Sequence, residues 1–362
     1  MEERECLIAL NAIGGMSASQ KIQIIKQFGS AQDIFQSKEK LASWPGASPS
    51  FIRNLKSTDP EKIFVREEKK AKLSGIRIIT QLNREFPCLL KEISDPPLAL
   101  YIKGTLPEDT SKSLAIVGSR KISHYGQVVC ERIVKELIAY GFWIVSGMAR
   151  GVDSMAHQTA IKGGGKTIAV LGSGLDVIYP PENKNLMKHI TENGAVISEF
   201  PFGTEPHKRN FPIRNRIISG LCPGLLVIEA REKSGALISA NCALDEGREV
   251  LAVPGNITSP NSKGTNQLIK QGARLVEDSE DIFEELGFHV YKEEKAHSTR
   301  SIFPEMNEEE VKIISFLSYD PIPIDLIIQK SGASPAHVHN ILLTLEMKEV
   351  IKQLPGKLFF RL

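Results

Sequence analysis

Short apolar runs alternate with helical patterns between Ser113 and about Glu285. The runs are nearly continuous in Val, Ile, Leu and Ala, which is typical of parallel strands that helices cover on both faces. We therefore predict an α/β fold with a Rossmann-like, doubly wound parallel sheet as its core. The predicted strands are Leu114–Val117, Trp143–Val145, Ile168–Leu171, Ala195–Ile197, Leu225–Ile228 and Val250–Val253.

The segments on either side of this core have different patterns. Residues 5–58 read as short helices joined by glycine-containing turns, which predicts a helical N-terminal domain of the helix-hairpin-helix (SAM-like) type. Hairpin N–H groups of such units can hold a phosphate, although a helical bundle with only a packing role fits the same pattern. After residue 303 come three helical segments and a hairpin across Pro355-Gly356, the order of a winged helix-turn-helix.

These patterns divide the chain into four parts. We predict a helical domain over 1–65, an extended Rossmann-like domain over 66–290, a polar linker over 291–302 and a C-terminal winged helix over 303–362. In the last part, Asn307 and Ser334 are predicted to cap helices, with Pro335 in the first turn of the helix that follows Ser334.

Composition limits the classes of function. Lys and Arg number 45 and Asp and Glu 43, so the net charge is +2 and any polyanion site must concentrate its positive charge locally. The N-terminus has no apolar signal segment and no apolar run approaches the length of a membrane span. The five cysteines are scattered without metal-ligand spacing. We therefore expect a cytoplasmic protein without membrane contact, metal or cofactor.

The segment 197–220 concentrates positive charge beside aromatic residues. Lys208, Arg209, Arg214 and Arg216 fall within nine residues that contain no acidic residue, and Phe211 lies among them. Cations that hold phosphates beside rings that stack on bases are what a single-stranded nucleic acid requires. The alternative is a solvated basic loop with ordinary turn prolines. Because exposed phenylalanine has no use in such a loop, we favour a nucleic-acid site.

The ends of the predicted strands support the same interpretation. Gly118-Ser119-Arg120, the loop around Gly147, and Ser234-Gly235 at a helix start all follow strands. Ligands of doubly wound sheets bind outside the carboxyl ends of the strands. Glycine permits close approach of a ligand, and N–H groups at helix starts suit anions. Each glycine alone fits an ordinary tight turn, but together the loops predict a groove for a phosphate chain.

Two segments resemble nucleotide-binding motifs but do not meet the requirements of those motifs. The segment 160–167 approaches P-loop spacing, but it ends a helix and enters a strand, the reverse of the required order. Gly172-x-Gly174 lacks the third glycine of a dinucleotide fingerprint. Glu199 and Glu229 end strands and could be catalytic, but hydrogen bonding to neighbouring loops or to the Arg cluster is the favoured interpretation. We expect no enzymatic activity, because no catalytic set stands out.

Several long motifs, in order, resemble the DNA-processing protein A (DprA, or Smf) family. They include V-G-S-R at 117–120, S-G-M-A-R-G-V-D-S-M-A-H at 146–157, F-P-I-R-N-R-I-I-S-G at 211–220 and V-P-G-N at 253–256. The resemblance implies a non-enzymatic protein that protects incoming single-stranded DNA during natural transformation, helps to load the RecA recombinase and forms a homodimer. It assigns DNA contact to Arg120, Lys208, Phe211 and Arg214. With the residues chosen above, the predicted DNA-binding set is Gly118, Ser119, Arg120, Gly147, Lys208, Arg209, Phe211, Arg214, Asn215, Arg216, Ser234 and Gly235.

Two other functions remain as alternatives. Rossmann-like phosphoribohydrolases of the lysine-decarboxylase-like type need a P-G-G-x-G-T loop and a following Glu, whereas this chain has P-G-N-I-T-S at 254–259. A sequence-specific duplex binder would use the helix Pro335–Leu345 of the winged helix. That helix contains His337, His339 and Asn340 but no Arg or Lys, so it lacks the side chains that most often recognise bases in the major groove.

Overall fold

A computed structural model describes residues 1–37, 44, 46–288, 306–318, 321–348 and 350–361. Contacts divide the chain into two compact units, Met1–Val290 and Tyr291–Leu362. The predicted linker 291–302 lies outside the described residues. The predicted boundary at residue 65 falls inside a helix, and the four domain boundaries stay a prediction.

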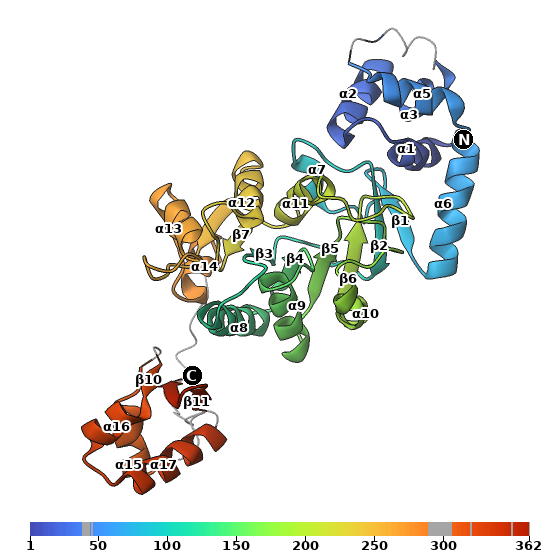
Figure 1. The fold of residues 1–362 in the computed structure, drawn as a ribbon. Helices are drawn as coiled ribbons and strands as arrows, with labels where there is room; N and C mark the ends of the chain where they lie inside the picture. The colour runs from blue at the N-terminus through green and yellow to red at the C-terminus, as the bar shows by residue number, and fades with distance from the viewer. Residues whose placement is uncertain (38–43, 45, 289–305, 319–320, 349, 362) are drawn as a thin grey trace. The chain divides into compact units, whose positions relative to one another are not determined.

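The first unit is built on one large sheet (Figure 1). Its order is β1-β2-β6-β5-β4-β3-β7-β8-β9, parallel from β6 to β9 and antiparallel where β2 pairs with β1 and β6. The mixed α/β fold with a mostly parallel sheet confirms the predicted class. The strands are β1 Arg77–Thr80, β2 Ala99–Gly104, β3 Ser113–Val117, β4 Trp143–Ser146, β5 Thr167–Val170, β6 Gly194–Ser198, β7 Gly224–Val227, β8 Glu249–Ala252 and β9 Arg274–Leu275.

Helices cover both faces of this sheet, as the apolar strands require. One face packs against α7 Cys88–Glu92, α11 Asn210–Gly220, α12 Gly235–Asp245 and α13 Lys263–Lys270. The other packs against α8 His124–Ala139, α9 Val152–Lys162, α10 Lys184–Glu192 and α14 Ser279–Glu285. Strand side chains alternate between the two layers: Ala115 and Val117 face one, Leu114 and Ile116 the other.

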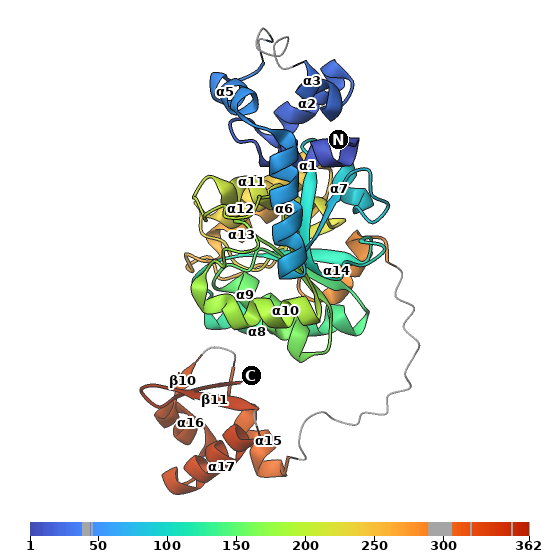
Figure 2. The same ribbon diagram turned by 90° about the vertical axis from the view of Figure 1, so that its right-hand side faces the viewer.

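The N-terminal segment is helical, as predicted (Figure 2). Its elements are α1 Glu3–Ala12, α2 Ala18–Phe28, α3 Ala31–Gln36, α5 Pro49–Ser57 and α6 Pro60–Ser74. Ser17 begins α2 with a capping box that includes Gln20. Gly75 ends α6 in the left-handed conformation, at a φ of 63°. Apolar side chains of α1, α2, α3 and α5 form a small core together with Leu98, which precedes β2.

The second unit is a winged helix. Its helices are α15 Glu308–Ile314, α16 Ile324–Ser331 and α17 Pro335–Met347, and its sheet has the order β10-β12-β11. The strands are β10 Ile322–Pro323, β11 Ile351–Leu354 and β12 Leu358–Arg361. The predicted caps are confirmed: Asn307 accepts a hydrogen bond from the Glu310 N–H, and Ser334 accepts one from the His337 N–H.

Candidate nucleic-acid interface

A groove of about 580 Å³ opens outside the carboxyl ends of β3 and β7. Most of its lining comes from three segments: the loop that follows β3, the β7–α12 loop with the start of α12, and α11 with Lys208 just before it. Ala149, Asp153 and Tyr179 complete it from the segments after β4 and β5. These segments are far apart in the sequence, and the parallel order β3-β7 brings their loops together at one edge of the sheet. Nine of the twelve predicted residues line the groove, namely Gly118, Ser119, Arg120, Lys208, Phe211, Arg214, Asn215, Ser234 and Gly235.

Phe211 lies at the centre of the charged side chains. Its ring is 5.6 Å from the guanidinium carbon of Arg120 and 5.9 Å from that of Arg214. The ring of Tyr179 lies 5.6 Å away at 40°. Phe211 is half-buried, and the buried core clusters of the described residues do not include it. An aromatic ring that is fixed by cations and still reaches a groove can stack on an unpaired base.

Gly147 and Arg214 form the floor beneath this ring. Arg214 is only 4% exposed, and its Nη1 donates hydrogen bonds to the carbonyl oxygens of Gly147, at 2.8 Å, and of Val170. A Cβ at Gly147 would lie 2.6 Å from the Arg214 guanidinium, so only glycine permits this approach. With Phe211 and Arg120, Gly147 lines a small pocket of about 20 Å³ beside the groove. Arg214 therefore supports the ring and the β4 loop from within.

Asp153 supplies the negative charge under this floor. Its Oδ2 accepts hydrogen bonds from the N–H groups of Gly147, at 3.2 Å, and Ala149, at 3.3 Å. Burial raises the pKa of Asp153 to about 6, and the positive charge of Arg214 opposes that shift. Burial likewise lowers the pKa of Arg214 to about 10, against the charge of Asp153. The two side chains are electrostatically coupled, so a change in one alters the loop that the other holds.

Three predicted residues lie outside the groove: Gly147, which lines the small pocket beside it, Arg216 and Arg209. Arg216 is 7% exposed and pairs with Glu199 and Asp95. It follows Arg214 by two residues, which corresponds to a rotation of about 200° around the helix axis, so the two side chains lie on opposite faces of α11. The structure thus places Arg216 in an ionic contact inside the protein and outside the groove, and its DNA contact stays a prediction. Arg209 is exposed at the start of α11 but does not line the groove.

The sequence interpretation missed further groove residues. Lys121, Arg231 and Lys233 are exposed cations in the loops after β3 and β7, and Tyr179 reaches the groove from the loop after β5. Arg231 Nε donates a hydrogen bond to Asn261 Oδ1 at 3.1 Å, which orients its guanidinium. The strand-end argument located these loops, but it selected only Arg120 among their basic residues. Counting the basic residues in the same loops would have found three of the four.

Comparisons with known proteins agree with this arrangement. Residues 77–287, more than half of the chain, match the family model described as DNA recombination-mediator protein A. The chain belongs to the DNA recombination-mediator protein A family. Residues 299–357 match the DprA winged helix domain. The chain is 40% identical to Protein Smf of Escherichia coli over 75% of this chain and 74% of that protein. It is 45% identical to DNA processing protein DprA of Bacillus subtilis over 59% of this chain and 72% of that one.

Solved structures of the family are similar as well. The DprA structure from Streptococcus pneumoniae matches with a TM-score of 0.67 and 33% identity, over 80% of this chain and 99% of that chain. DNA processing protein A from Helicobacter pylori, whose structure concerns its single-stranded DNA binding mode, matches with a TM-score of 0.51 and 29% identity, over 58% of this chain and 95% of that chain. The fold around the groove is therefore that of this family.

In this family member, the carboxylates at the strand ends, Glu229 and Glu199, hold neighbouring residues by hydrogen bonds. Glu229 accepts hydrogen bonds from the N–H of Ser123, at 2.9 Å, and from its hydroxyl. Glu199 pairs with Arg216. The interpretation of both carboxylates as loop and arginine partners is confirmed. The described residues contain no cluster of three His, Cys, Asp or Glu side chains that could hold a metal.

In the segment 160–167 and in the loop after β8, side chains of the protein contact the glycines that a nucleotide would have to approach. The segment 160–167 ends α9 and enters β5, as predicted, and a Cβ at Gly163 or Gly165 would collide with Ile138. In the loop after β8, the Asn266 side chain bonds both the N–H and the carbonyl of Gly255, at 3.2 and 2.9 Å. The hydrolase alternative is not favoured, because this loop does not present a free N–H of Gly255. Within the described residues, helices long and apolar enough to cross a membrane are absent.

Proposed function

We propose that this protein binds single-stranded DNA along the groove, protects the strand during DNA uptake and presents it to a recombinase. The observation that carries the proposal is the half-buried Phe211 ring, held between Arg120 and Arg214 at the mouth of a basic groove. The family relative from Helicobacter pylori, which binds single-stranded DNA, supports it. We propose binding without turnover or cofactor, and a cytoplasmic setting, which the five free cysteines support.

The groove has more cations than a single phosphate needs. Arg120, Lys121, Lys208, Arg231 and Lys233 are all exposed at its edges. Each cation that contacts a phosphate releases a counterion from the nucleic acid, so affinity falls with salt in proportion to the number of contacts. Exposed Glu232 lies between Arg231 and Lys233 and subtracts one charge. A chain of phosphates can follow the row of cations past Phe211, which positions successive bases near the ring.

The experiment that tests this function replaces Lys208 with alanine. We expect Lys208→Ala to weaken binding to single-stranded and duplex oligonucleotides alike, and to reduce the slope of log affinity against log salt by about one. Affinities across a salt series by fluorescence anisotropy measure both quantities. Lys188→Ala removes an exposed lysine from α10 on the opposite face of the sheet and is the matched control. Equal slopes for both variants and wild type would exclude Lys208 as a phosphate contact.

RecA is the proposed protein partner, as the family resemblance implies. A recombinase acts on a strand whose bases are accessible, so the groove must hold the strand without enclosing it. The open position of the groove at the sheet edge supports such a transfer. If loading depends on the groove, Lys208→Ala will lower RecA loading on single strands in parallel with its loss of DNA affinity.

We also propose a homodimer formed by the first unit. Large aliphatic side chains of this unit outside the groove are exposed, with Ile257 at 84% and Leu244 at 58%. Exposed apolar side chains gain free energy when a second copy covers them. Light scattering at micromolar concentration should therefore give twice the mass of the chain, and Ile257→Asp should shift the equilibrium towards monomer. A wild-type protein that remains monomeric under these conditions would contradict the proposal.

A further inference from the structure

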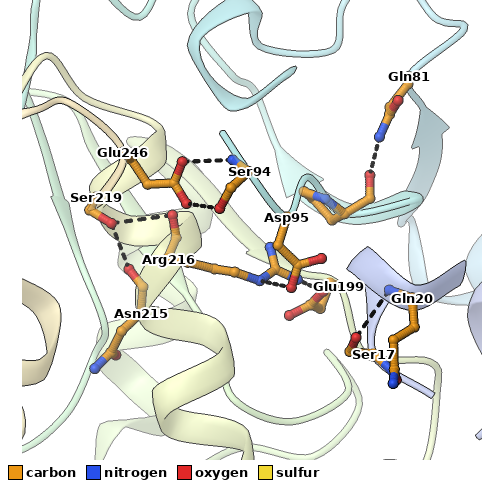
Figure 3. Close-up of polar contacts among 11 residues, drawn as sticks. Ser17, Gln20, Gln81, Ser94, Asp95, Glu199, Asn215, Arg216, Ser219 and Glu246 are labelled. Carbon is orange, nitrogen blue, oxygen red and sulfur yellow. Dashed lines mark hydrogen bonds and ion pairs between the residues drawn. The ribbon is translucent and has the colours of Figure 1, made fainter. Parts of the chain in front are cut away.

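Arg216 is the centre of a buried ionic network on the side of α11 that faces away from the groove. Figure 3 shows its side chain extending from α11 between Asp95 and Glu199. Arg216 Nη2 donates a hydrogen bond to Glu199 Oε2, and Nε lies 3.2 Å from Asp95 Oδ2 without the geometry of a hydrogen bond. Arg216 and Glu199 are each 7% exposed. The network therefore joins α11 to the end of β6 and to the loop after α7.

The N-terminal helices contact the same network. Asn11 of α1 donates a hydrogen bond to the carbonyl oxygen of Glu199 at 2.8 Å, and Lys21 of α2 donates one to the carbonyl oxygen of Asn11 at 3.0 Å. Lys21 is only 5% exposed. The backbone N–H of Ser19, in the first turn of α2, lowers the pKa of Asp95 and so partly opposes the effect of burial. Two helices that do not line the groove are thus connected to the helix that carries Phe211.

Burying these charged side chains costs free energy, so apolar side chains would pack the same volume more favourably. Burial raises the pKa of Glu199 and of Asp95, and it lowers the pKa of Lys21 to about 8. Asp95 Oδ1, Glu199 Oε1 and Arg216 Nη1 have no hydrogen-bond partner among the described residues. Buried ion pairs often stabilise a fold less than apolar side chains of similar volume. Their directional contacts instead favour one orientation of the elements that they join, here α11 relative to β6, α1 and α2.

The position of α11 decides the geometry of the groove. Phe211 and Arg214 precede Arg216 on the same helix by five and two residues, so a rotation or shift of α11 displaces the ring and the floor together. Arg216 makes the contacts of the network on one side of the helix, whereas the opposite side, with Phe211 and Arg214, lines the groove. A rigid helix transmits a change at Arg216 to Phe211 and Arg214.

We propose that Lys21, Glu199, Asp95 and Arg216 are positioning residues for the DNA groove, through which the N-terminal helices hold α11 in its binding orientation. This inference rests on the proposed single-stranded DNA function. It assigns the N-terminal helical segment a part in DNA affinity without contact with the nucleic acid. The coupling follows a chain of direct contacts: α2 to α1 to the end of β6 to α11.

The test replaces Lys21 with methionine, which keeps the length of the side chain and removes its charge. We expect Lys21→Met to weaken single-stranded DNA binding roughly 3- to 30-fold. The salt slope should be unchanged, because Lys21 touches no phosphate. Hydrogen exchange should become faster in peptides that cover 210–220 and stay unchanged in β3, β7 and α8. Lys26→Met, an exposed charge on the same helix, is the matched control and should retain full affinity.

A double-mutant cycle separates coupling from general destabilisation. In an Arg216→Met background, Lys21→Met should have little further effect on DNA affinity, because the link is already broken. Lys21→Arg should restore affinity by retaining the charge. If Lys21→Met does not fold, Asn11→Ala breaks the same link without removing a buried charge and should give the same selective loss.

Other outcomes overturn the inference. Unchanged affinity with a lower melting temperature would mean that the network is structural only, and equal losses for Lys21→Met and Lys26→Met would indicate long-range charge. Failure of the proposed function is distinguishable: in that case Lys208→Ala and Phe211→Ala would also bind single-stranded DNA like the wild type.

Discussion

Replacing Phe211 with alanine is expected to weaken single-stranded DNA binding by roughly 5- to 150-fold, since stacking of a base on an aromatic side chain contributes about 1–3 kcal/mol. The ring is available for this contact because it is half-buried and lines the groove. Arg120 and Arg214 fix it from two sides. Duplex DNA hides its base faces in the helical stack. Duplex affinity should therefore change little in Phe211→Ala.

Salt titrations separate this contribution from that of charge. Phe211→Ala removes no cation, so its salt slope for single-stranded DNA should equal that of the wild type. Phe211→Tyr keeps the ring and should retain most of the affinity. The melting temperature is the control for folding. If Phe211→Ala instead lowers the melting temperature and weakens both DNA forms equally, the ring packs the protein and does not stack on bases.

The core of the fold could be predicted because its strands are almost wholly apolar. All six predicted strands of the parallel sheet are present, within two residues at either end. β2 is not among the predicted strands, because Ala99–Gly104 directly follows Pro96-Pro97 and prolines argue against a strand in the interior of a sheet. Its partners β1 and β6 are both antiparallel to it, and such pairing depends on tertiary contacts that local periodicity does not contain. β9 has only two residues and gives no pattern of its own.

The candidate site was predictable at the level of loops rather than of side chains. The rule that ligands bind outside the carboxyl ends of strands located the groove correctly. The charge cluster 208–216 was read as one surface, although it continues into α11, where Arg214 and Arg216 face opposite ways. The partner of Arg216 was present in the sequence as Glu199, but Asp95 and Lys21 come from distant segments. Only the fold shows that these charges are buried together.

Burial gives Arg214 a different role from that of a surface cation, and Arg214→Met should destabilise the protein by roughly 2–5 kcal/mol. The carbonyl oxygens of Gly147 and Val170 would lose their donor, and an unsatisfied buried acceptor costs about 1–3 kcal/mol. The buried Asp153 carboxylate would also lose the positive charge that lowers its pKa. Single-stranded DNA binding should fall as well, because Phe211 loses its support.

Thermal and chemical denaturation of variants at this helix measure the effect. A loss of 2–5 kcal/mol corresponds to roughly 4–20 °C in melting temperature for a domain of this size. Arg214→Lys should restore part of the stability, since one ammonium group can bond a carbonyl but cannot reproduce the planar fork. Arg209→Met is the matched control: it removes an exposed arginine at the start of α11 and should leave the melting temperature within about 2 °C. If Arg214→Met melts like Arg209→Met while the salt slope falls by one, Arg214 acts as a phosphate contact and its buried hydrogen bonds contribute little to stability.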